Sequence, residues 1–216
     1  MLVQEKMTKS LVTARADMSV TDALELMHEK KVSRLPVLDS HGNLVGIVSE
    51  GDLLYASPSP ATSLNVWEIH SLLTKLKVDK VMTRPVITVS QDTPIEEAAR
   101  LMVEKRIGGL PVMQGKTLVG IITVADLFKV FFALFGGMRA GVRVSASISG
   151  AKGTFSKISG AISQAGGNIV GLGFEEVSDF PQEEWEMTMK VQDLPQDKVV
   201  EVLKPIVRKI LDVRTM

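Results

Sequence analysis

The first two-thirds of the chain contain an internal repeat, and a repeat of this kind requires two copies of one supersecondary unit. The segment Met7–Thr13 (MTKSLVT) returns as Met82–Thr88 (MTRPVIT), at an offset of 75 residues that Pro36 and Pro111 also keep. The offset falls to 74 past a glycine-containing turn that is one residue shorter in the second copy. A surface turn tolerates such a length change and a core does not. The repeat is therefore structural, and its turn lies at the surface.

Composition narrows the class of protein. A chain of 216 residues that is 45% hydrophobic can bury a substantial core in one or two domains. The formal net charge of zero gives no basic field for nucleic acid or an anionic membrane. The absence of cysteine excludes disulfides and thiolate metal sites and fits a reducing compartment. With neither a signal-peptide pattern nor an apolar run of about 20 residues, we expect a cytoplasmic protein without nucleic-acid or membrane partners.

Each copy is predicted to run strand, helix, strand, strand, helix. Apolar residues at i, i+3, i+4 and i+7 mark the first helix of each copy, beginning at Val20 and at Ile95. In the second copy Pro94 is expected in the first helical turn. Two short β-rich runs around a glycine-containing turn follow, and the last helix is expected to start from Asp52 or Asp126.

One short pattern occurs at the same place in both copies: a hydroxyl residue and, three positions later, an aspartate. These are Ser49 with Asp52 and Thr123 with Asp126, each at a predicted junction of a strand and a helix. A hydroxyl and helix-start amides suit a phosphate, and a carboxylate accepts hydrogen bonds from both hydroxyls of a ribose. Each aspartate could instead simply cap its helix, and the two roles are compatible.

The paired units resemble two CBS motifs, the tandem called a Bateman module, over roughly residues 1–135. The diagnostic strings are GIVSEGD (46–52) and GIITVAD (120–126), in register with RLPV (34–37) and GLPV (109–112). The resemblance implies an adenine-type base against the first strand, a cleft lined by the Leu-Pro segments, and a phosphate at Arg34, which could otherwise be a surface charge. The implied ligand-binding residues are Val12, Thr13, Arg34, Leu35, Pro36, Ser49, Asp52, Ile87, Thr88, Gly109, Leu110, Pro111, Thr123 and Asp126.

The predicted domains are copy one at 1–56, a Pro/Ser linker and helix at 57–78, copy two at 79–135 and a C-terminal domain at 140–216. The linker text and its leucine-rich helix are similar to the acetoin-utilization AcuB-like subfamily. Four phenylalanines, at 128, 131, 132 and 135, share one helical face before Gly136 and Gly137. We expect them to be buried against a partner or the following domain, because an exposed aromatic patch is a liability.

From Val142 the pattern changes to β-α-β-β-α-β, which is a ferredoxin-like order and makes the whole chain α+β. Together with Gly153-Thr154-Phe155 and Gly166-Gly167-Asn168-Ile169 it resembles an ACT domain. ACT domains commonly bind amino acids near these segments, but Lys152 replaces the usual residue, so pairing without a ligand stays open. The acidic residues between 175 and 186 are interpreted as a solvated hairpin rather than a metal site. Gly171 and Gly173 lack the context of a dinucleotide fingerprint.

Function is predicted from what the motifs can do. No nucleophile with a base, pair of tuned acids or metal site stands out, so we expect a protein that is not an enzyme and has no catalytic cofactor. The prediction is a regulatory sensor of an adenine nucleotide, with AMP, ADP, ATP, NAD and S-adenosylmethionine not distinguished, that signals to the ACT-like domain or a partner. The resemblance implies a homodimer through both domain types and a metabolic enzyme as a possible partner. The alternative is a dimeric scaffold with empty clefts that regulates an enzyme by contact.

Overall fold

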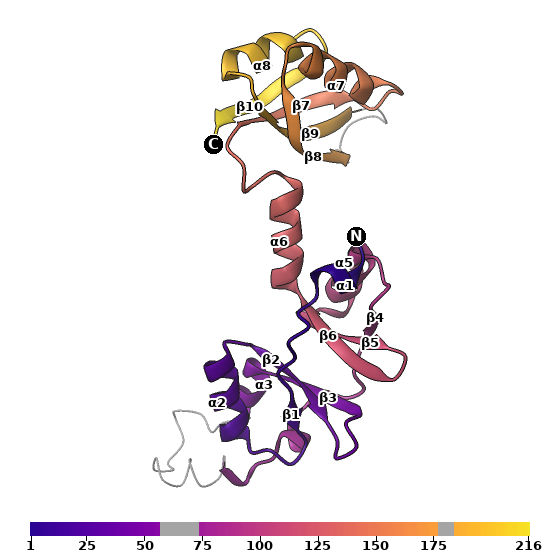
Figure 1. Ribbon diagram of the computed structural model, residues 1–216, viewed down its shortest axis with the longest axis vertical. Coiled ribbons are helices and arrows are strands. Elements are labelled where there is room, and N and C mark those ends of the chain that lie inside the picture. The colour runs from indigo at the N-terminus through magenta and orange to yellow at the C-terminus, as the bar shows by residue number, and fades with distance from the viewer. Residues whose placement is uncertain (57–73, 177–183) are drawn as a thin grey trace. The chain divides into compact units, whose positions relative to one another are not determined.

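The computed structural model describes residues 1–56, 74–176 and 184–216, and the chain divides into two compact units, 1–127 and 128–216 (Figure 1). Most of the predicted linker and helix at 57–78, and the acidic residues Asp179 and Glu183, lie outside the described residues. Within the described ranges, no helix has both the length and the apolar character needed to span a bilayer.

The strands of both copies lie in the first unit, and each copy has the predicted order of elements after a short helix that was not predicted. The first copy consists of α1 (Val3–Lys6), β1 (Ala14–Arg15), α2 (Val20–Lys30), β2 (Arg34–Leu38), β3 (Leu44–Ser49) and α3 (Glu50–Tyr55). The second consists of η1 (Val78–Lys80), β4 (Val89–Ser90), α5 (Ile95–Lys105), β5 (Gly109–Gln114), β6 (Thr117–Thr123) and α6 (Val124–Leu134). In each copy the short first strand pairs parallel to the second, which pairs antiparallel to the third.

Local hydrogen bonds explain where the helices begin, and two of the predicted helix starts are corrected by the structure. The Ser19 hydroxyl accepts a hydrogen bond from the Asp22 amide and caps α2. Pro94 was predicted in the first turn of its helix and instead occupies the N-cap of α5. The last helices begin at Glu50 and Val124, two residues before the aspartates that were predicted to start them. Each aspartate can thereby reach back to its N-cap residue.

The two copies exchange their N-terminal segments. Thr8 exchanges two backbone hydrogen bonds with Ile121 of the second copy, at 2.9 and 3.1 Å. Thr83, the counterpart of Thr8, does the same with Ile47 of the first copy, at 2.8 and 3.3 Å. Val78 accordingly belongs to the core of the first copy. Each copy therefore pairs its last sheet strand with a segment of the other.

Methionine and glycine make this exchange close-packed. A Cβ atom added to Gly46 would lie 2.1 Å from Sδ of Met82, and one added to Gly120 would lie 2.4 Å from Sδ of Met7. Real Cβ atoms do not approach other atoms this closely, so each glycine provides the space for the methionine of the other copy. The repeated methionine and the repeated glycine are thus two sides of one contact.

The second unit has the predicted ferredoxin-like fold. Its elements are β7 (Val142–Ser149), α7 (Thr154–Gln164), β8 (Asn168–Glu176), β9 (Glu184–Gln192), α8 (Gln196–Leu203) and β10 (Lys209–Thr215). The antiparallel sheet has the order β10-β7-β9-β8. Its core consists of buried side chains from the sheet and from α7 and α8, such as Ile158, Met187 and Leu203. Figure 1 shows the two helices on one face of the sheet.

The C-terminal end of α6 lies against the other face of this sheet. Gly136, at φ +65°, ends the helix. A Cβ on Gly171 would lie 2.3 Å from the Phe135 carbonyl carbon, and one on Gly173 would lie 2.3 Å from its ring. The two glycines of β8 therefore leave the space that the backbone and the ring of Phe135 occupy. Within this chain Phe128, Phe131 and Phe132 remain 67%, 58% and 49% exposed, so the following domain does not bury them and their burial against a partner stays a prediction.

Candidate functional site

The signature of the first copy folds into a reciprocal cap at the start of α3. The Asp52 carboxylate accepts hydrogen bonds through Oδ2 from the Ser49 amide at 2.8 Å and the Ser49 hydroxyl at 2.7 Å. The Asp52 amide donates to Ser49 Oγ at 3.3 Å. The capping role is therefore real. Among the described residues Oδ1 has no hydrogen-bond partner, so the same carboxylate can still accept from a ligand.

The second copy repeats this arrangement in a less accessible place. Asp126 Oδ2 accepts from the Thr123 amide at 3.0 Å and the Thr123 hydroxyl at 2.8 Å. Asp126 is only 7% exposed, whereas Asp52 is half-buried. Both aspartates accept from the amide and the hydroxyl of the residue three positions earlier, but the carboxylate of the first copy is more open to a ligand.

A cleft of about 250 Å³ lies beside the first signature. Residues of both copies line it, because the exchanged segment of the second copy runs next to β3 of the first. They are Arg34, Ile47, Ser49, Asp52, Thr83, Pro85, Ile87, Arg106, Ile107, Gly108 and Gly109. The cleft thus combines a carboxylate and a hydroxyl with apolar side chains and two guanidinium groups.

Arg34 reaches from the first copy onto the second. A Cβ on Gly108 would lie 2.2 Å from its Nη2, and one on Gly109 would lie 3.3 Å from its Cδ. The Arg34 counterpart by repeat is Gly109, so one arginine covers the glycines where a symmetric second arginine would stand. Arg106, which was not predicted as a site residue, adopts a left-handed conformation at the C-cap of α5. The sequence could have indicated it, because Arg106 comes three residues before the predicted site residue Gly109.

The structure places the other predicted residues in three surroundings. Ile87 lines the cleft, but the adjacent Thr88 lines a neighbouring hollow with Val86. Val12 packs on the core of the first copy, and Thr13 beside it is half-buried. Four residues are buried and absent from the lining of the cleft: Leu35, Pro36, Leu110 and Pro111. The structure therefore does not bring these four to the cleft surface.

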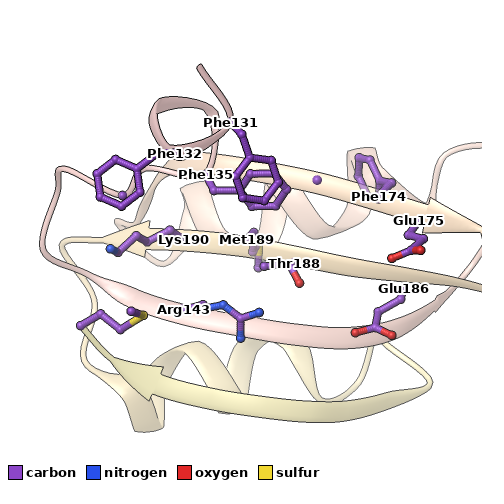
Figure 2. A pocket seen from close by; sticks show the side chains of 13 residues that line it. Phe131, Phe132, Phe135, Arg143, Phe174, Glu175, Glu186, Thr188, Met189 and Lys190 are labelled. Atoms are coloured by element: carbon purple, nitrogen blue, oxygen red, sulfur yellow. The ribbon is translucent and has the colours of Figure 1, made fainter. Parts of the chain in front are cut away.

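The second unit holds a larger cavity, of about 720 Å³, that contains none of the predicted site residues (Figure 2). It lies between the C-terminal end of α6 and the sheet, with Phe131 and Phe135 on one side and Arg143, Thr188 and Lys190 on the other. A shallower hollow of about 430 Å³ lies elsewhere in this unit, beside Phe155 and Asn168, where the ACT resemblance implies amino-acid binding.

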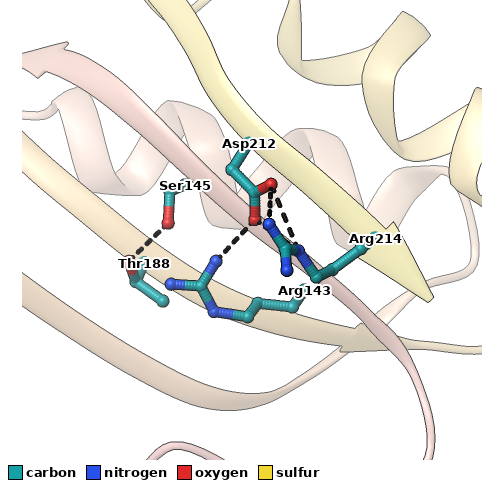
Figure 3. A network of polar contacts seen from close by, with 5 residues as sticks. All are labelled: Arg143, Ser145, Thr188, Asp212 and Arg214. Carbon is teal, nitrogen blue, oxygen red and sulfur yellow. Dashed lines mark hydrogen bonds and ion pairs between the residues drawn. The ribbon is translucent and has the colours of Figure 1, made fainter. Parts of the chain in front are cut away.

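A polar network borders the larger cavity (Figure 3). Asp212 accepts hydrogen bonds from Arg143 Nη1 at 2.8 Å and from Arg214 Nε at 2.9 Å. Ser145 and Thr188 share a hydrogen bond of 2.7 Å on the neighbouring strands. The hydrogen bonds from Arg214 are the main reason that the pKa of Asp212 lies below its usual value, and Arg143 adds to the effect.

We expect Arg214→Met to raise the pKa of Asp212 toward that of an ordinary aspartate. A carboxylate whose folded pKa is lowered stabilises the fold above its unfolded pKa and loses this contribution as the pH falls through the folded value. Carboxyl ¹³C NMR titration of the full chain measures the change directly. Asp39 is the internal control, because its lowered pKa has a different cause, hydrogen bonds from Asn43. An unchanged Asp212 pKa in the variant would contradict the assignment to Arg214.

Comparisons with known proteins place these observations in a family. A CBS domain-containing protein of Dictyostelium discoideum is 38% identical over 127 residues, which are 58% of this chain and 88% of the relative. Other relatives are longer, and the matched region is only 24% of the L-aspartate semialdehyde sulfurtransferase of Methanocaldococcus jannaschii, at 30% identity and over 64% of this chain.

Three solved structures each resemble about three-fifths of this chain. The CBS domain pair of protein MJ0100, in complex with 5′-methylthioadenosine and S-adenosyl-L-methionine, is 29% identical and matches 64% of this chain and 98% of its own, with a TM-score of 0.52. CBSX2 in complex with AMP is 34% identical, with 61% and 96% covered and a TM-score of 0.50. A protein assigned to acetoin utilization (AcuB) from Vibrio cholerae is 30% identical, with 64% and 95% covered and a TM-score of 0.53.

The CBS domain family itself matches residues 3–59 and 78–133, which are the two copies of the repeat. The prediction of a tandem CBS module with AcuB-like relatives is confirmed, and the ferredoxin-like fold of the second unit agrees with the predicted ACT-like architecture, although its ACT membership stays a prediction. With paired signatures, exchanged segments and a cleft shared by both copies, the chain belongs to the CBS-domain family.

Proposed function

We propose that this chain is a regulatory protein that binds an adenine nucleotide in the cleft beside Asp52. The observation that carries the proposal is the composition of this one cleft. It contains a hydrogen-bond-accepting carboxylate at Asp52, a hydroxyl at Ser49, apolar side chains such as Ile87, and the guanidinium groups of Arg34 and Arg106. Each of these groups matches one part of a nucleotide.

The ribose, the adenine and the phosphate of a nucleotide would each contact a different group of the cleft. Asp52 Oδ1 accepts hydrogen bonds from the vicinal hydroxyls of a ribose, while Oδ2 continues to cap α3. The isoleucines at 47, 87 and 107 provide apolar surface for the flat faces of an adenine. The two arginines bind phosphate oxygens through charge-assisted hydrogen bonds.

The arginines also favour one class of adenosyl ligand over another. Two cations in a small cleft attract a phosphate and repel the sulfonium of S-adenosylmethionine. Solved relatives contain ligands of both kinds, AMP in CBSX2 and 5′-methylthioadenosine with S-adenosylmethionine in MJ0100. For this chain we expect tighter binding of AMP, ADP, ATP or NAD than of S-adenosylmethionine.

Regulation follows from the sharing of the cleft between copies. A ligand that contacts Asp52 of the first copy and Arg106 of the second favours the arrangement in which both sets of contacts are made. The resulting coupling is no larger than the difference in the ligand's affinity for the two arrangements, typically about 1–3 kcal/mol. Helix α6 begins one residue after Thr123, and it would carry the change toward the ACT-like domain of a homodimer or a partner enzyme.

We expect Asp52→Asn to weaken nucleotide binding by about 10- to 100-fold, because hydrogen bonds to a charged group contribute about 1.5–3 kcal/mol. Isothermal titration of the full chain with AMP, ADP, ATP, NAD and S-adenosylmethionine measures the affinities. Arg34→Met and Arg106→Met should weaken the binding of AMP but leave the binding of adenosine, which has no phosphate, nearly unchanged. This contrast separates loss of a phosphate contact from a damaged cleft.

Asp126→Asn is the matched control. It removes the equivalent cap of α6, so it should cost about the same 1 kcal/mol of stability as Asp52→Asn while leaving nucleotide affinity intact. Equal affinities in the wild type and Asp52→Asn would place the ligand elsewhere. If none of the five ligands released or absorbed heat with the wild-type chain, the sensor proposal would fail in favour of a scaffold with empty clefts.

A further inference from the structure

The face of the sheet opposite α7 and α8, against which the end of α6 lies, carries its charges in rows across the strands. Arg143 of β7 lies opposite Lys190 of β9, and two residues along these strands Ser145 lies opposite Thr188. One step further Glu186 of β9 lies opposite Glu175 of β8. A cationic row, a hydroxyl row and an acidic row therefore follow one another along the cavity shown in Figure 2.

These pairings do not serve the stability of the sheet. Like charges directly opposite each other on neighbouring strands destabilise a sheet, and the cavity has one such pair at each end. Arg143 is partly compensated by Asp212. Lys190 is only 5% exposed as a residue, and among the described residues its ammonium has no hydrogen bond or ion pair, so it depends on solvent in the cavity. A lysine buried to this extent normally has a partner of opposite charge.

The space in front of Lys190 is large and mostly apolar. The cavity of about 720 Å³ has the side chains of Phe131, Phe135 and Phe174 in its wall. The phenyl rings of Phe131 and Phe135 lie against each other, with centroids 4.6 Å apart. Every residue that lines the cavity belongs to the second unit, so the cavity is complete within one compact body. It is also separate from the hollow beside Asn168.

We propose that this cavity binds a small monocarboxylate with an apolar body. The carboxylate provides the partner of opposite charge that the Lys190 ammonium lacks among the described residues. The apolar body lies along the phenylalanine wall. The acidic row disfavours a second negative charge, because the far carboxylate of a dicarboxylate would lie closer to Glu175 and Glu186. This site is independent of the nucleotide cleft and does not rest on the function proposed for it.

Three probes of equal length test the charge pattern on the wild-type chain. We expect hexanoate to bind at least about tenfold more tightly than 1-hexanol, which lacks the charge, and than adipate, which has a second one. Calorimetry gives the affinities, and chemical shifts of the Thr188 and Lys190 amides locate the site. Equal affinities for hexanoate and hexanol would overturn the role of Lys190, and failure of all three probes to bind would overturn the site.

Variants then assign the charges. Lys190→Met keeps the length of the side chain and should weaken hexanoate at least about tenfold, while Lys190→Arg should retain binding. The matched control is Lys209→Met, an exposed lysine on β10 of the same sheet, which should leave the affinity unchanged. Glu175→Gln combined with Glu186→Gln should bring adipate toward the affinity of hexanoate. If this double variant still bound adipate weakly, the acidic row would not be the reason that a second negative charge is disfavoured.

Discussion

Replacing Gly171 with valine is expected to destabilise the C-terminal unit by about 3 kcal/mol or more. Its Cβ would lie 2.3 Å from the carbonyl carbon of Phe135 and 2.7 Å from the Gly136 amide nitrogen, and backbone atoms cannot move aside as a flexible side chain can. Either β8 distorts or the end of α6 leaves the sheet and exposes the Phe135 ring. For a unit of this size each kcal/mol corresponds to about 4–8 °C in Tm.

Hydrogen exchange followed by mass spectrometry tests this prediction region by region. Amides of β8 and β9 should lose protection in Gly171→Val, whereas those of the first unit should keep theirs. Gly160→Ala on α7 is the matched control, because a Cβ there meets nothing within 4 Å. This change should stabilise the helix by up to about 1 kcal/mol. Unchanged protection of β8 in Gly171→Val would show that α6 does not need the glycine.

The exchanged segments predict a second large effect, at Gly46 and Met82. Met82→Ala should cost about 2–5 kcal/mol, because it empties a buried position that is 8% exposed. Gly46→Ala should cost about 1–3 kcal/mol, because its Cβ would overlap the Met82 sulfur. The double variant should be more stable than the sum of the two losses implies, by about 1 kcal/mol or more, since the new methyl group fills the space that the methionine leaves.

Urea unfolding of the four proteins gives the coupling free energy. Gly51→Ala provides the comparison within the same copy, since the nearest atom to its Cβ would be Ser49 Oγ at 3.7 Å, an ordinary contact. That variant should not couple to Met82→Ala. Strict additivity of Gly46→Ala and Met82→Ala would mean that the two residues do not pack together, and it would count against the exchange of segments between the copies.

The sequence predicted the elements of the repeat well and their pairing less well. Repetition identifies Met7 with Met82 and Gly46 with Gly120, but this equivalence is the same whether each methionine packs on its own copy or on the other. Only the structure distinguishes the two. For the same reason the sequence could not show that Ile87 of the second copy meets Asp52 of the first in one cleft.

The cavity of the C-terminal unit was not predictable, although the fold around it was. Alternation of apolar residues predicts which face of a strand is buried, and it predicted this sheet. The charge rows depend on the register between strands far apart in the chain, such as Arg143 opposite Lys190. Gly171 and Gly173 were correctly set apart from a dinucleotide motif, but their role in holding Phe135 needs the position of α6.

The exchange of segments also determines when the repeat can fold during synthesis. The core of the first copy includes Val78 and Met82, so it stays incomplete on the ribosome until translation has passed these residues. The second copy in turn receives Thr8, which left the ribosome long before its partner Ile121. The nascent chain therefore cannot finish its first copy and then start its second, as independent domains do. Both copies reach their stable form in one late event.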